Sequence, residues 1–140
     1  MDAKVDISDV YLPGEEDNTV PVYETCNEVR RKIRAHLSKC GVTQAQFCRD
    51  ICAQFHLDNG PANIQAAQLS RFLSARGPRA GTKSIVFYGA YLYFEKIRIK
   101  QGKCKSRHRL DMERLWPKGL PRDRDSRTES ALPNPQYVPD

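Results

Sequence analysis

The sequence has no hydrophobic run long enough to span a membrane. Its longest apolar stretch, residues 85–94, is far shorter than the roughly 20 residues that a membrane helix needs. No apolar run follows Met1, so we expect neither a signal peptide nor a membrane partner. The five cysteines are an odd number and include no close Cys-x-x-Cys pair. This pattern favours reduced thiols in the nucleus or the cytoplasm over a disulfide-bonded secreted protein.

Sequence motifs of catalysis are missing as well. There is no glycine-rich loop to cradle a phosphate, no nucleophile elbow, and no pair of acids within an apolar stretch. The histidines lie in polar or mixed surroundings without an evident partner. We therefore expect a protein that is not an enzyme and that carries no cofactor.

Charge and proline content divide the chain into three parts. Residues 1–23 are acidic and lack periodicity, so we expect a disordered or loosely attached arm. Residues 24–116 carry the helical signals and an excess of Lys and Arg, which suits a partner rich in phosphate. The acidic arm can also lie over this basic surface and compete with such a partner. Residues 117–140 contain repeated prolines and a charged string, which predicts a disordered tail.

Helix signals recur between the two tails. Thr25 and Glu28 form a capping box, in which the threonine oxygen accepts a free backbone N–H and the glutamate reaches back. Thr43 and Gln46 repeat this pattern. We expect helices at about 25–38, 43–55, 63–75, 84–101 and 108–116.

The apolar stretch within the fourth of these segments is ambiguous. Its aromatic and β-branched residues favour a strand, but it continues through EKIRIK to Gly102, which is longer than a strand usually runs. We therefore predict a helix that is apolar on all sides and lies centrally, with Gly89 allowing close contact. The sequence thus predicts an all-α fold, a small four- to five-helix bundle with disordered N- and C-terminal tails.

The helix expected at 63–75 is amphipathic, with Leu69 and Phe72 on its apolar face. The opposite face carries small residues and amides, which leave room for close approach and can bond base edges or phosphates. Arg71 suits a guanine or a phosphate, and Gln68 suits an adenine. The outward face consists of Ile64, Ala67, Arg71 and Ser74, flanked by Asn63, Gln68 and Ser70.

Two segments resemble the helix-turn-helix of phage-repressor-type DNA-binding domains: VTQAQFCRDI at 42–51 and QLSRFLS at 68–74. The resemblance covers about residues 24–100 and implies a four- or five-helix bundle whose third helix enters the major groove. The connection at 53–63 is longer than in that family. The segments SRFLSARGPRAG and FYGAYLYFEKIR also resemble an uncharacterised fungal domain. This second resemblance supports the fold and implies little about activity.

These patterns predict binding of double-stranded DNA through the helix at 63–75 and the basic loop at 76–83. The free N–H groups at the start of the second helix are expected to grip a phosphate. The alternative is a protein-interaction module, in which the face around Ile64, Ala67 and Arg71 docks an acidic or amphipathic helix. The residues expected at the groove or the backbone are Gln44, Gln68, Ser70 and Arg71, with Arg79 and Lys83 holding phosphates.

A run of basic residues follows the central helix. It can bind phosphates or serve as a nuclear-import signal, which predicts a nuclear protein, with a cytoplasmic one as the alternative. It can also be a solvated helix end, with its cations at the negative pole of the helix dipole. The run consists of Lys96, Arg98, Lys100, Lys103, Lys105, Arg107 and Arg109.

Cys48, Cys52 and His56 have a spacing that places side chains on one helical face, as a zinc site requires. The two cysteines, however, share that face with Phe47 and Ile51, and a buried free cysteine behaves as a small hydrophobe. We therefore expect core cysteines and no metal site.

Overall fold

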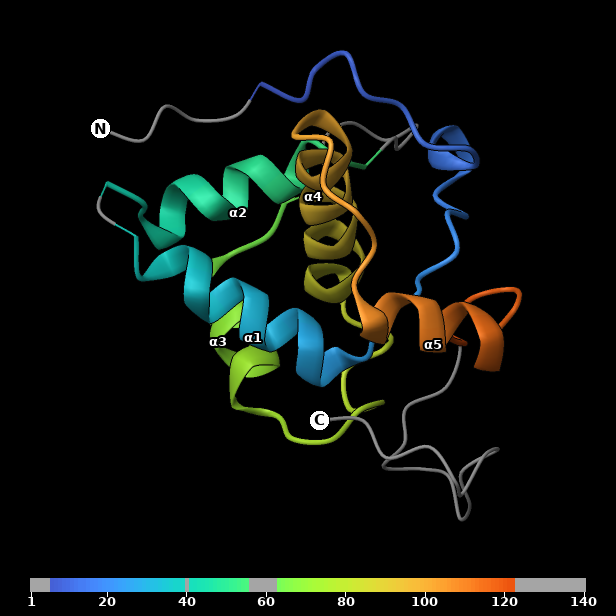
Figure 1. The fold of residues 1–140 in the computed structure, drawn as a ribbon. Helices are drawn as coiled ribbons and strands as arrows, with labels where there is room; N and C mark the ends of the chain where they lie inside the picture. The colour runs from blue at the N-terminus through green and yellow to red at the C-terminus, as the bar shows by residue number, and fades with distance from the viewer. Residues whose placement is uncertain (1–5, 40, 56–62, 123–140) are drawn as a thin grey trace.

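The computed structural model describes residues 6–39, 41–55 and 63–122, which form helices and no strand. The expectation of an all-α fold is confirmed. In Figure 1, α4 runs vertically through the bundle, α1, α2 and α3 lie on one side of it, and the N-terminal arm and α5 lie on the other. The described elements are a short 3-10 turn, η1 (Glu15–Asp17), and the helices α1 (Cys26–Leu37), α2 (Gln44–Cys52), α3 (Ala66–Ser74), α4 (Ile85–Lys100) and α5 (Arg107–Leu115).

The central helix α4 is apolar around most of its circumference, and its first nine residues after Ile85 include no charged side chain. Phe87 and Leu92 are fully buried. At Gly89 the helix α2 crosses so closely that a Cβ atom would lie 2.9 Å from the Phe55 ring and 3.2 Å from the Ile51 carbonyl oxygen. The ambiguous stretch is therefore a helix, and Gly89 permits the close crossing that the sequence predicts.

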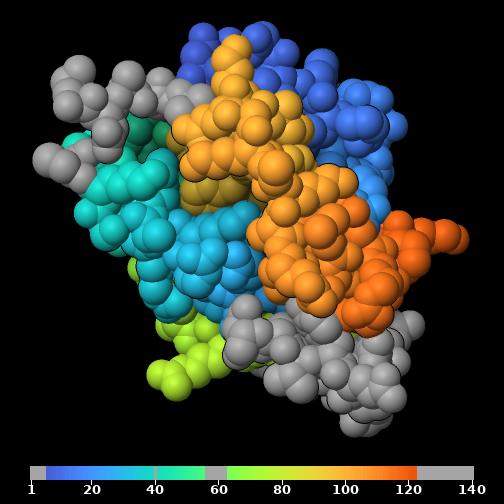
Figure 2. Space-filling view, viewed as in Figure 1, coloured from blue at the N-terminus to red at the C-terminus, as the bar shows by residue number. Residues whose placement is uncertain are grey.

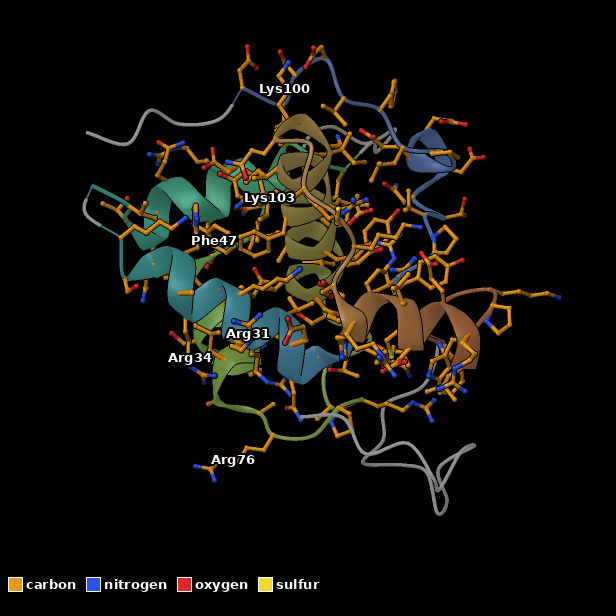
Figure 3. The ribbon with its side chains drawn as sticks, viewed as in Figure 1. Arg31, Arg34, Phe47, Arg76, Lys100 and Lys103 are labelled. Carbon is orange, nitrogen blue, oxygen red and sulfur yellow. The ribbon has the colours of Figure 1, made fainter. Side chains whose placement is uncertain are left out.

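Helix starts follow the predicted caps. The hydroxyl oxygens of Thr25 and Thr43 accept the backbone N–H groups of Glu28 and Gln46, each at 3.1 Å. The glutamate of the first capping box differs from the prediction, because the Glu28 carboxylate pairs with Arg31 at 2.6 Å. Between α1, α2 and α4, the buried Phe47 ring contacts aromatic rings of α4 (Figure 3).

The start of the third helix also differs from the expectation. The helix begins at Ala66 rather than at residue 63, and Ile64 is 5% exposed. Its backbone N–H donates to the Cys52 sulfur at 3.2 Å. Ile64 therefore belongs to the core, and it does not lie on the outward face of α3.

The described part of the acidic arm packs on the bundle, which differs from the expected disorder of residues 1–23. Leu12, Val20 and Val22 are buried in the same core as the helices. The Tyr88 hydroxyl on α4 accepts the backbone N–H of Val20 at 3.0 Å. These apolar side chains follow no helical or strand period, so the sequence pattern gave no sign of their burial.

An ion pair inside the protein fixes the arm to α4. The Lys96 ammonium lies 2.7 Å from the Glu15 carboxylate, and the side chains are 6% and 4% exposed. The other Glu15 oxygen accepts the Leu12 N–H at 3.0 Å. Asp9 and Lys100 form a second, exposed pair at 2.8 Å near the end of α4, where Figure 2 shows the arm against the helix.

The segment after α5 continues the fold as far as the structure describes it. Leu120 is buried, and its N–H donates to the Val22 carbonyl at 2.7 Å. The Arg122 guanidinium lies 3.9 Å from the centre of the Tyr88 ring. The first residues of the expected tail therefore pack on the arm, whereas residues 1–5 and 123–140 lie outside the described residues. No helix among the described residues is long and apolar enough to cross a membrane.

The buried pair gives the first prediction. Glu15→Gln leaves the Lys96 ammonium buried without its counter-charge, so we expect the free energy of unfolding to fall by about 3–5 kcal/mol in urea denaturation. The control is Asp9→Asn, which removes a solvent-exposed pair and should leave the urea midpoint unchanged. Equal midpoints for the two variants would mean that the arm is not part of the cooperatively folded unit.

Candidate nucleic-acid interface

The outward face of α3 carries small and basic side chains. Leu69 and Phe72 turn inward and are 0% and 3% exposed. Because α3 has 3.6 residues per turn, the side chains between these two positions point outward. We call the α3 surface the exposed residues Ala67, Ser70, Arg71 and Ser74.

A buried arginine on α1 holds the end of α3 in place. Arg30 is 2% exposed, and its guanidinium donates to the Phe72 carbonyl at 3.3 Å and to the Ala80 carbonyl at 2.9 Å. The same guanidinium lies over the Phe72 ring, 5.0 Å from its centre. One bond reaches a carbonyl in the last turn of α3 and the other a carbonyl in the loop, so the two together fix both α3 and the loop that follows it.

The loop at 75–84 has little freedom beside α1. The Pro78 carbonyl accepts the Cys26 N–H at 2.8 Å, and the Asn27 side chain accepts the Gly77 N–H at 3.2 Å. Gly81 has a φ of 106°, and a Cβ atom there would lie 2.8 Å from the Phe72 ring. A glycine is therefore required both for the backbone conformation and for the space.

Further cations border the α3 surface. Arg34 on α1 donates to the Leu73 carbonyl of α3, and Arg76 follows α3 directly. Figure 3 shows Arg34 on the α3 side of α1 and Arg76 extending away from the lower edge of the bundle. Lys83 is exposed in the same loop. Since residues 59–94 contain no Asp or Glu, no carboxylate of this segment offsets these cations.

The predicted DNA contacts differ in how exposed their side chains are. Ser70 and Arg71 are exposed on one face of α3, and Gln44 is exposed at the first turn of α2. The half-buried Gln68 uses its side-chain oxygen to accept the Gln65 N–H at 2.8 Å, which caps α3. Arg79 is 5% exposed, and its guanidinium lies 5.4 Å from the centre of a Trp116 ring.

Most of the predicted basic run is engaged within the protein. Lys96 is buried against Glu15, as described above, and Arg109 is 9% exposed. Arg109 lies 2.8 Å from Glu95 and 2.8 Å from Glu113. The remaining ion pairs are Arg98–Glu95 at 2.8 Å, Lys100–Asp9 at 2.8 Å, Lys105–Glu113 at 2.8 Å and Arg107–Asp111 at 3.3 Å.

Glu95 is the centre of this network. Burial disfavours its charged form, but hydrogen bonds from Arg98 and Arg109 hold the pKa of Glu95 below its ordinary value. The network attaches α5 to α4, and Arg109 also covers the Tyr23 ring at 5.0 Å. Lys103 is exposed on the segment after α4 (Figure 3). Lys96 and Lys100 therefore link the arm to α4, and Arg109 links α5 to α4.

Arg34 and Arg76 are not among the DNA contacts that the sequence predicts. A signal for them was present in the long segment without acids and in the four-residue spacing of Arg30 and Arg34, which puts both on the α3 side of α1. For metals, the described residues contain no group of three or more His, Cys, Asp or Glu side chains that could hold an ion. His56 lies outside the described residues.

Gln68 gives the second prediction. Gln68→Ala removes the side chain that caps α3, so we expect the free energy of unfolding to fall by about 0.5–2 kcal/mol. Ser70→Ala is the matched control on the same helix, because Ser70 is exposed, and its thermal melting temperature should equal that of the wild type. A Gln68→Ala protein as stable as the Ser70→Ala protein would show that the cap contributes nothing.

Comparison with known proteins gives one family. The family described as Domain of unknown function (DUF7726) matches residues 20–104. The matched segment contains α1 to α4 and the whole α3 surface, and it ends before α5. No curated protein and no solved structure gives a significant match. Because the matched segment is more than half of the 140 residues, the chain belongs to this family of uncharacterised domains.

Proposed function

We propose that the protein binds double-stranded DNA through the α3 surface. The main support is an exposed helix face of small side chains around Arg71, in a segment without acids, bordered by Arg76 and by Arg34 of α1. Small side chains let a helix approach the floor of the major groove, and arginines beside it can reach the phosphates.

The order of the helices also supports this proposal. α2 is followed by α3, and both pack against α4. In phage-repressor domains, which the sequence resembles, the third helix enters the groove, and we assign that role to α3. The longer connection between α2 and α3 does not loosen α3, because Arg30 fixes its end and Ile64 fixes the segment before its start.

The exposed residues then take separate roles. Ser70 and Arg71 face base edges or the backbone, because they lie on the outward face of α3. Arg34, Arg76 and Lys83 reach phosphates on either side of it. Gln44 contributes at the start of α2, where the first backbone N–H groups favour an anion. Arg79 is buried against Trp116 and positions the loop.

The acidic arm lies away from the α3 surface. Asp9 and Glu15 pair with Lys100 and Lys96 near the end of α4, whereas the loop after α3 leads into its start. At 1.5 Å per residue the two ends of α4 are roughly 24 Å apart. Figure 1 shows this part of the arm and the loop at opposite ends of the bundle. Asp9 and Glu15 are therefore placed where they do not compete with phosphates for the α3 surface.

The alternative, in which α3 docks a protein partner, lacks the exposed apolar side chain that such a contact needs. Ile64 was the large apolar residue on the expected outward face, and it is buried. The exposed residues that remain on α3 are small or polar, which suits a nucleic acid better than an amphipathic helix.

The third prediction compares two basic sites in duplex binding. Arg71→Ala and Arg76→Ala should each weaken binding to a random 20-base-pair duplex and lower the slope of log affinity against log salt by about one unit, because each releases about one counterion. Fluorescence anisotropy over a salt series measures both quantities. The control is Lys103→Ala, which removes an exposed cation outside the α3 surface and should leave the slope unchanged.

Two outcomes would contradict the proposal. A loss of slope in Lys103→Ala but not in Arg71→Ala would move the phosphate contacts to the segment after α4. Unchanged duplex affinity in Arg71→Ala, together with loss of a bound protein partner, would make α3 a docking surface. Arg79→Ala separates stability from binding, because it should lower the melting temperature through the lost contact with Trp116.

A further inference from the structure

An open cleft of about 670 Å³ lies between the N-terminal arm, the end of α2 and α4. Ile7, Val10 and Tyr11 line it from the arm, Gln54 lines it just after α2, and Tyr93 lines it from α4. In Figure 1 this part of the arm passes beside the end of α4. The size of the cleft falls within the range of about 300–1,000 Å³ that is usual for small-ligand sites.

Carboxylates outnumber cations along the cleft. Asp6, Glu15 and Asp50 line it together with the ammonium of Lys96. Lys96 lies 2.7 Å from Glu15, so the charges of these two side chains offset each other. Asp6 and Asp50 therefore give the cleft a surplus of negative charge, which favours a cationic ligand over a phosphate or a carboxylate.

Neighbouring side chains hold Asp50 in place on the cleft wall. The Gln46 side-chain amide, one turn earlier on α2, donates to the Asp50 carboxylate at 2.9 Å. Burial raises the pKa of Tyr93 to about 12, and the charge of Asp50 and its hydrogen bond with Tyr93 act in the same direction. The Tyr93 hydroxyl therefore keeps its proton and donates it to Asp50 in a hydrogen bond.

The side chain of Gln54 points to a ligand independently of the acids. Gln54 is 5% exposed, and its amide nitrogen donates to the backbone carbonyl of Asp50 at 3.0 Å. Its Oε1 atom is buried and accepts no hydrogen bond from any of the described residues. A buried acceptor without a donor is costly and rare in folded proteins. Because Gln54 lines the cleft, an N–H group of a ligand bound there can satisfy this oxygen.

Tyr11 adds an exposed aromatic ring to the same cleft. Its side chain is 63% exposed, which makes it one of the few large apolar side chains of the described residues that the fold leaves uncovered. The face of an aromatic ring attracts a cation, and a planar guanidinium also stacks on it. Ile7 and Val10 offer apolar contact to the methylene stem that carries such a group.

We propose that this cleft binds an alkylguanidinium group, the cation of an arginine side chain. Asp6 and Asp50 supply the counter-charge, Gln54 accepts an N–H, and Tyr11 covers the planar face. A guanidinium presents several N–H donors in one plane, whereas the compact ammonium of lysine does not stack. The group belongs either to a small guanidinium compound or to an arginine of a peptide. The cleft lies beside the arm rather than beside α3, so the proposal does not rest on DNA binding.

The test is isothermal titration calorimetry of the full chain with acetyl-arginine-amide. We expect one site per chain and a dissociation constant below about 1 mM. Acetyl-citrulline-amide has a similar shape without the charge and should bind about tenfold more weakly, and acetyl-lysine-amide should also bind more weakly. A capped Gly-Arg-Gly peptide separates the two sources. Tighter binding of the peptide than of the single residue supports a peptide ligand, and equal binding supports a small compound.

Two variants change exposed side chains of the cleft and should therefore fold. Asp6→Asn and Tyr11→Ala should each weaken the binding of acetyl-arginine-amide about threefold or more. The matched control is Asp17→Asn, which removes the same charge from an exposed acid of η1 that does not line the cleft. It should bind as the wild type does.

A further measurement uses the wild-type chain alone. In ¹⁵N spectra, titration with acetyl-arginine-amide should shift the side-chain amide resonances of Gln54 and leave those of the exposed Gln101 in place. The proposal is overturned if acetyl-arginine-amide does not bind, if acetyl-citrulline-amide binds equally well, or if the Gln54 resonances do not move. Wild-type affinity in both Asp6→Asn and Tyr11→Ala would also overturn it.

Discussion

The burial of α4 on all its sides is the constraint on which the rest of the structure depends. Tyr88 and Tyr91 are 1% exposed, and each aromatic side chain of this kind removes roughly 150–250 Å² from water. A helix that is apolar around most of its circumference needs cover from several directions. α1, α2 and α3 supply it on one side, and the arm and α5 supply it on the other (Figure 1). Gly89 sets how closely α2 can approach.

This arrangement also determines what remains exposed. Two cations, Lys96 on α4 and Arg109 on α5, are buried and have carboxylate partners. Of the cations next to α3, Arg71, Arg76 and Lys83 lie in the long segment that contains no Asp or Glu. Arg30 donates hydrogen bonds to carbonyls of α3 and of the loop that follows it. The backbone from which Arg71 and Arg76 extend is therefore fixed. Arginines that hold the helices together, such as Arg30 and Arg109, are thus buried, whereas Arg34, Arg71 and Arg76 are exposed.

Local signals made much of the fold predictable, and long-range contacts limited the rest. The caps at Thr25 and Thr43 predicted where α1 and α2 begin, and the length of its apolar stretch predicted that α4 is a helix. The packing of the arm depends on a bond between Glu15 and Lys96, which are 81 residues apart. No pattern within a short stretch of sequence can reveal such a contact. In the candidate site, Ser70 and Arg71 are exposed as their helical positions predict. The burial of Arg79 results from Trp116 on a distant element.

The most direct test of the α3 surface is a map of backbone amide chemical shifts of the ¹⁵N-labelled chain during titration with a random duplex. We expect shifts that concentrate at residues 66–83 and 31–35, with small changes in the arm at residues 9–20. The salt dependence of these shifts should follow that of the affinity. Shifts centred on residues 98–107, with those of α3 unchanged, would contradict the assignment of α3 as the helix that meets DNA.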